Sequence, residues 1–232
     1  MKPIKFVFFI LLFIFFTIIG TISHEYGHIL VAKYYGFETQ LHYGSMNYKN
    51  KDEDKQIEIY NRNKEAIKEK ANYSEKEIYE NLSRNIALKD LYVFIGGPFQ
   101  TILTGTLGFI ILLYRRNKIK KFGLKNLDWL FVFLSLFWLR EVINLVLSVS
   151  RAIIQGNKNF FSGDEKNIAL MLEIYKGSIA IPLAIIGLIV SIYVVFKIIP
   201  KAERLHFITS GFIGGIAGFI IWMNVLGPKI LP

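Results

Sequence analysis

The chain alternates between long apolar stretches and shorter charged ones. A helix needs about 20 apolar residues to cross a bilayer, and five stretches reach or approach that length. They cover residues 4–23, 91–114, 128–150, 178–199 and 206–226. This pattern predicts an all-α polytopic membrane protein with about five transmembrane helices. We expect residues 1–232 to form a single transmembrane domain.

A polar insert, residues 37–90, separates the first and second apolar stretches and carries ten basic and eleven acidic side chains. Its beginning, residues 37–46, alternates enough between apolar and polar positions to predict a strand or hairpin. Near its end, Ser74 and Glu77 form a capping-box pattern ahead of spaced apolar residues, which predicts a helix starting there. The insert is therefore expected to be a small α/β unit.

The first apolar stretch follows Lys2 and Lys5, as the apolar part of a signal peptide would. The stretch is longer than such a region normally is, however, and no small-x-small cleavage site follows it. We therefore predict an uncleaved span that continues as a helix through Lys33 and stops at Gly36.

The last apolar stretch contains closely spaced glycines. They are Gly211, Gly214, Gly215 and Gly218, and their small-xxx-small spacing lets a second helix approach closely. We interpret them as a helix-packing surface and not as a ligand site.

Composition supports a membrane setting, since 53% of the residues are hydrophobic. The net charge of +10 has a simple explanation, because many basic residues flank apolar stretches and can anchor at lipid headgroups. Examples are Arg115, Arg116, Lys118, Lys120, Lys121 and Lys125. We therefore expect a multi-pass protein of the cell membrane, in contact with the lipid bilayer and with no nucleic acid. The absence of cysteine excludes disulfides, thiolate metal sites and cysteine nucleophiles.

Residues 24–28, at the end of the first apolar stretch, read His-Glu-Tyr-Gly-His. On a helix, His24 and His28 project from one face, one turn apart, so both imidazoles can bind one metal ion. Glu25 emerges beside them, where it can activate water for hydrolysis. This spacing is typical of zinc hydrolases and predicts a Zn²⁺ site at membrane depth.

A catalytic zinc site usually has a third protein ligand and keeps a fourth position open. Asp164 lies in a short polar segment after the third apolar stretch, and Glu141 lies inside that stretch, where an ionisable group is costly. The remaining donors are Glu165, His42 and His206. We expect Asp164 to be the third ligand, with Glu141 as the alternative.

A second motif, Gly-Gly-Pro-Phe-Gln-Thr at residues 96–101, stands at the start of the second apolar stretch. If the first two spans are antiparallel, it lies at the same membrane face as the histidine pair. Glycine and proline there predict a kinked or broken helix. Gln100 and Thr101 would then lie near the metal and bind the substrate backbone.

At these motifs the chain resembles the site-2-protease type of intramembrane zinc metalloproteases. These enzymes carry His-Glu-x-x-His in an early span, Gly-Pro-x-x-Asn at the opening of the next, and a zinc-binding Asp in or beside a third. Residues 24–28 match the first motif, and residues 97–101 match the second except that Thr101 stands in place of Asn. Asn144 and Leu145 resemble the start of the third element, and Asp164 takes the place of its Asp.

The resemblance implies a zinc metalloendopeptidase of the HExxH type. Its partner would be a membrane protein or peptide, cut at a membrane-embedded or membrane-near peptide bond. Two other functions stay open at this point: a catalytically inactive, protease-like membrane scaffold, and a metal-binding transporter.

Overall fold

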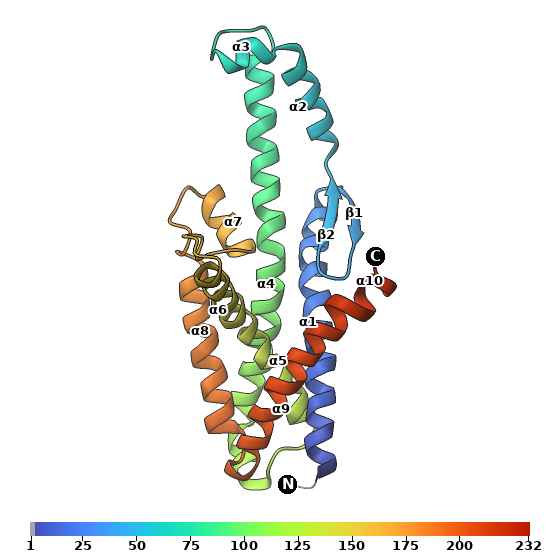
Figure 1. Cartoon of the computed structure of the whole chain (residues 1–232), viewed down its shortest axis with the longest axis vertical. Helices are drawn as coiled ribbons and strands as arrows, with labels where there is room; N and C mark the ends of the chain where they lie inside the picture. The colour runs from blue at the N-terminus through green and yellow to red at the C-terminus, as the bar shows by residue number, and fades with distance from the viewer. Residues whose placement is uncertain (1–2) are drawn as a thin grey trace.

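The computed structural model describes residues 3–232, which fold almost entirely into helices (Figure 1). Five helical segments are long and apolar enough to cross a membrane. They are Ile4–Tyr34, Lys76–Phe122, Asn126–Ile154, Ala180–Ile198 and Lys201–Ile230. The predicted class, an all-α polytopic membrane protein with a small α/β insert, is therefore confirmed.

Helix α1 (Pro3–Tyr34) is uninterrupted, as predicted. Its end follows from Gly36, which has a φ of +76°. In that conformation the N–H of Gly36 bonds to the carbonyl of Lys33, and the N–H of Phe37 bonds to the carbonyl of Ala32. This is a Schellman cap, which satisfies the last carbonyls of the helix and turns the chain away.

The insert begins with a hairpin of β1 (Glu38–Leu41) and β2 (Met46–Lys49), paired antiparallel. The prediction of a hairpin is confirmed, although its second strand extends beyond the predicted segment. Phe37 stacks on Tyr48 with ring centroids 5.5 Å apart, which fixes the hairpin against the end of α1. Helices α2 (Lys51–Arg62) and α3 (Lys64–Lys68) follow.

Helix α4 (Lys76–Phe122) joins the end of the insert and the second span in one helix of 47 residues. It is roughly 70 Å long, far more than the 30 Å of a bilayer's hydrocarbon core. Its first part therefore projects from the membrane together with α2 and α3 (Figure 1).

Two predictions about α4 are wrong. The helix is capped by Glu75 without a side-chain hydrogen bond, so the capping box of Ser74 and Glu77 does not form. The helix also continues through Pro98 and is not broken there. The physical reason is packing, because neighbouring helices in a membrane protein can hold a proline-containing helix together.

The third span is bent where α5 (Asn126–Ser135) passes through a short 3₁₀ turn, η1 (Leu136–Trp138), into α6 (Leu139–Ile154). The chain then forms α7 (Asp164–Met171), which packs beside α4 (Figure 1). Helix α8 (Ala180–Tyr193), extended by the π-helical η2 (Val194–Ile198), runs along α6. The segment that joins α6 to α8 therefore places α7 against α4.

The last span consists of α9 (Lys201–Ile220), the π-helical η3 (Ile221–Leu226) and α10 (Gly227–Ile230). Helix α9 packs on α1 through its glycines. A Cβ at Gly214 would lie 2.6 Å from the Cβ of Phe13, and one at Gly218 would lie 2.9 Å from the Cα of Ile14. The interpretation as a packing surface is confirmed for these positions, whereas Gly215 faces no atom within 4 Å.

We predict that Gly214→Ala lowers the melting temperature of the detergent-solubilised protein. The added methyl group would push α9 away from α1, and such overpacking costs about 1–3 kcal/mol. Gly215→Ala is the matched control, because its methyl group enters open space and alanine favours a helix by about 1 kcal/mol. Equal melting temperatures for the two variants would contradict this packing.

Candidate metal centre

The two motif histidines lie side by side in the last third of α1. His24 is 1% exposed and His28 is 6% exposed. Their Nε2 atoms are 3.3 Å apart, and their ring planes are inclined at 79°. The two imidazoles therefore project from one face of α1, as their spacing of four residues predicted.

Asp164, the first residue of α7, directs its carboxylate at the same two Nε2 atoms. Its Oδ2 atom lies 2.9 Å from His24 Nε2 and 3.4 Å from His28 Nε2. The preceding Gly163 has a φ of +81°, a conformation that favours glycine and turns the chain into α7 at this point. In the part of the chain that the structure describes, these three residues form the group of His and acidic side chains that could hold a metal ion.

The separations of the three donor atoms suit a tetrahedral ion. Zinc bonds of about 2.0–2.2 Å place neighbouring ligand atoms about 3.3–3.6 Å apart. The donor atoms here are separated by 2.9, 3.3 and 3.4 Å. A small widening at the His24–Asp164 edge would give the geometry of a site with three protein ligands and one open position.

Helix α4 fixes the orientation of both rings. The Nδ1 atom of His28 lies 2.7 Å from the carbonyl oxygen of Val93, and a carbonyl can only accept, so Nδ1 carries the proton. The Nδ1 atom of His24 lies 2.9 Å from Thr101 Oγ1, which can accept in the same way. Both Nε2 atoms then face the carboxylate of Asp164, where each can offer a lone pair to a metal ion or, when protonated, a hydrogen bond to the carboxylate.

The supporting residues of α4 follow the same spacing as the histidines. Val93, Gly97 and Thr101 are four residues apart, so they share one face of the helix. A Cβ at Gly97 would collide with the Nε2 atoms of both His24 and His28. Gly97 therefore allows the close approach of α4 to the imidazoles.

The two helices touch directly beside the site. A Cβ at Gly27 would lie 2.7 Å from the Cβ of Gln100, and one at Gly96 would lie 3.0 Å from Val31 Cγ2. Sequence reasoning missed the carbonyl of Val93, because a backbone group has no signature in the sequence.

Asp164 remains ionised in this setting. Burial opposes its charge, but the interactions with His24 and His28 outweigh that effect and hold the pKa of Asp164 below its usual range. Its side chain is 25% exposed, so it is the most accessible of the three donors. Solvent can therefore reach the site from the side of α7.

Glu25 follows His24 directly and is 6% exposed. It lies near enough to His28, Asp164 and Arg140 to interact with their charges. Arg140, on α6, also interacts with His24 and was not among the predicted site residues. The site thus combines three metal-ligand groups, one further carboxylate and one positive charge.

The other predicted residues take different positions. Thr101 is 1% exposed, and its Oγ1 contacts His24 Nδ1. Gln100 bonds through Nε2 to Thr104 Oγ1 at 3.0 Å, while its Oε1 is buried without a partner. Glu141 is not part of the three-residue group. It lines a separate cavity together with Glu165, because α6 turns its side chain toward the start of α7 and away from α1.

The two remaining histidines are also outside the group. His42 lies at the hairpin turn, where its Nε2 is 3.1 Å from Asn47 Nδ2. His206 is on α9, with its ring against Phe6. Their positions leave Asp164 as the third donor.

The chain matches no protein-family model, no curated protein and no solved structure.

We predict that Thr101→Val weakens metal binding by about 10–100-fold, as loss of a hydrogen bond to a ligating histidine usually does. Valine has the same shape as threonine but cannot accept the proton of His24 Nδ1. Competition with a chromogenic chelator would measure the affinity. Thr209→Val, at an exposed position of α9, is the control and should bind metal like the wild type. Unchanged affinity in Thr101→Val would remove Thr101 from the site.

Proposed function

We propose that this chain is an intramembrane zinc metalloendopeptidase, which hydrolyses peptide bonds of membrane-embedded or membrane-near substrates in the cell membrane. One observation carries the proposal. Two imidazole nitrogens and a carboxylate oxygen meet within 3.4 Å of one another, and the charge of a fourth ionisable group, Glu25, acts on the same cluster. Three such donor atoms suit a bound cation.

The donor set suits zinc in particular. Two imidazoles and one carboxylate are a common ligand set of catalytic zinc, and such sites leave a position open for water or substrate. His24, His28 and Asp164 would hold the ion. When bound, zinc would supply Lewis-acid chemistry, polarising the substrate carbonyl and making water more acidic.

Glu25 is the proposed general base. It would accept a proton from the attacking water and then donate it to the leaving amine. Arg140 of α6 lies near enough to interact with the charge of this carboxylate. Gln100 would accept a hydrogen bond from a substrate N–H through its unpaired Oε1.

The depth of the site fits a reaction that consumes water. His24 lies about 30 Å along α1 from its beginning, so it would stand near one face of the bilayer. Solvent would enter beside Asp164, the exposed donor. A helical substrate would have to unwind, because its carbonyls are engaged in the helix. The hairpin of β1 and β2 lies at the end of α1 and offers a strand edge for the unwound segment.

The same donor set would also serve a metal-binding transporter or an inactive scaffold. Neither of those functions requires a buried carboxylate beside the ligands, whereas hydrolysis does. The position of Glu25 therefore favours the protease.

We predict that Glu25→Gln retains zinc but cleaves a model transmembrane peptide in proteoliposomes at least 100-fold more slowly. Glutamine keeps the size of the side chain and cannot accept the proton, and a general base contributes about 10²–10⁴-fold. Glu80→Gln, at an exposed position of α4, controls for the loss of one negative charge. Undiminished cleavage by Glu25→Gln would reject the mechanism. Absence of cleavage by zinc-loaded wild type would instead favour the scaffold or transporter.

We also predict that Asp164→Ala loses both zinc and cleavage, because only the two histidines remain as ligands. Zinc content after gel filtration and peptide cleavage would be measured on the same sample. Glu173→Gln, an exposed acidic residue just after α7, should keep both properties. Full zinc occupancy in Asp164→Ala would show that another residue completes the site.

A further inference from the structure

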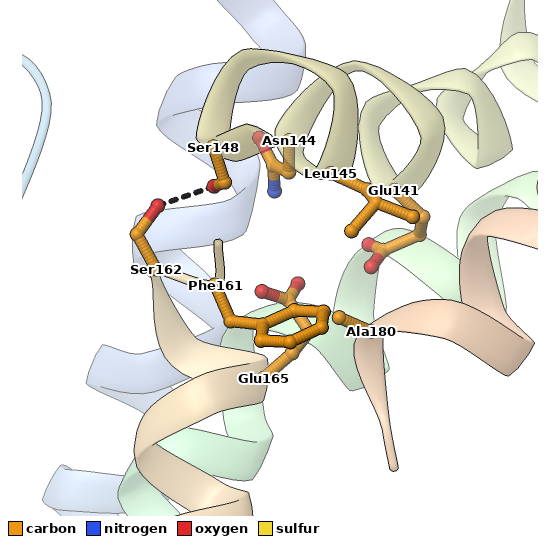
Figure 2. A pocket seen from close by; sticks show the side chains of 8 residues that line it. All are labelled: Glu141, Asn144, Leu145, Ser148, Phe161, Ser162, Glu165 and Ala180. Carbon is orange, nitrogen blue, oxygen red and sulfur yellow. Dashed lines mark hydrogen bonds between the residues drawn. The ribbon is translucent and has the colours of Figure 1, made fainter. Parts of the chain in front are cut away.

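Two buried glutamates face a small cavity between α6 and α7. Figure 2 shows the carboxylates of Glu141 and Glu165 directed into the same space, which the side chains of Asn144, Ser148 and Ser162 also line. Ser148 and Ser162 are joined by a hydrogen bond across one end of the cavity. None of these residues belongs to the candidate zinc group.

The two carboxylates lack the partners that buried acids normally have. Each residue is 2% exposed. Neither oxygen of Glu141 nor the Oε1 of Glu165 accepts a hydrogen bond from another described residue, although the two carboxyl groups lie close enough to share one between them. The adjacent Arg140 acts on Glu141 only through its electric field. Burying a charge without a partner costs several kcal/mol, so two such groups facing one cavity need compensation.

Another buried acid of this chain, Asp128, has hydrogen-bond donors that stabilise its charge. Asp128 is 1% exposed, and it accepts hydrogen bonds from Arg115 Nε and from the backbone N–H of Lys125. The oxygens of Glu141 have no comparable donor among the described residues.

The size and lining of the cavity identify the kind of partner. It offers about 10 Å³ for the centre of a water-sized sphere, enough for one water or one ion. The donor atoms available are mainly oxygens, from two carboxylates and two serine hydroxyls, with the side-chain amide of Asn144 beside them. Oxygen-rich sites select hard cations such as Mg²⁺, Mn²⁺ and Ca²⁺, in contrast to the imidazole-containing group nearby.

We propose that the cavity between α6 and α7 is a second metal site, in which Glu141 and Glu165 hold one hard divalent cation. The ion would tie the start of α7 to α6. Glu165 follows Asp164 directly, so the same tie would hold the third donor of the first site in place. The proposal does not depend on proteolysis.

Mn²⁺ is the probe that tests the site, through the loss of its free-ion electron paramagnetic resonance signal. The full chain with His24→Ala and His28→Ala, in detergent, lacks the first site and should bind one Mn²⁺. Adding Glu141→Gln and Glu165→Gln should weaken this binding at least 100-fold, whereas adding Glu173→Gln should not change it. Ca²⁺ should displace the bound Mn²⁺. A background that binds no Mn²⁺ at millimolar concentration, or binding that survives both glutamine changes, would overturn the proposal.

A second measurement uses proteins that keep both histidines, so that misfolding of the His24→Ala/His28→Ala variant cannot affect its result. Zinc-saturated wild type should bind one additional Mn²⁺ and melt at a higher temperature with it. Glu141→Gln/Glu165→Gln should keep its zinc but show no Mn²⁺-dependent rise. Without Mn²⁺ it should melt above the wild type, because glutamine relieves the close approach of two buried carboxyl groups. A lower melting temperature without Mn²⁺, or an undiminished Mn²⁺-dependent rise, would contradict the second site. Failure of peptide cleavage alone would bear only on the proposed protease.

Discussion

The arrangement of the site depends on one electrostatic constraint: three polar donor atoms lie within 3.4 Å of one another in a buried place. The contact of His28 Nδ1 with the carbonyl of Val93 turns its Nε2 toward Asp164. The contact of His24 with Thr101 turns a second Nε2 toward the same carboxylate. Three such atoms repel one another unless a proton or a cation stands among them, and the surrounding helices hold them together.

Close helix contact provides the rigidity that this convergence requires. Helices α1 and α4 run antiparallel, with the histidines of one opposite Val93, Gly97 and Thr101 of the other. Because both sets repeat every four residues, each histidine meets its own partner on α4. Glycine at positions 27, 96 and 97 removes the side chains that would separate the two helices. The contact between α1 and α4 therefore packs the two helices together and also orients the imidazole rings.

Buried charge also connects the candidate zinc group with the rest of the bundle. Asp164 and Glu165 are neighbours at the start of α7, yet they face different clusters. The first meets the histidines of α1, and the second meets Glu141 of α6. The short helix α7 thus lies between two groups of titratable side chains. Its position, and with it the third donor, depends on how the charges of both groups are compensated.

Local patterns were enough to predict the spans, the hairpin, the paired histidines with Glu25, and Asp164 as the favoured third donor, because each rests on periodicity or composition within a short window. The sequence by itself thus determined the helical membrane architecture and the chemistry offered by α1. Only the tertiary structure brought Asp164 and not Glu141 to the two histidines, set Thr101 against His24, and kept α4 continuous through Pro98. These outcomes depend on which faces of distant helices meet, and on backbone groups such as the Val93 carbonyl. No short stretch of sequence encodes either one.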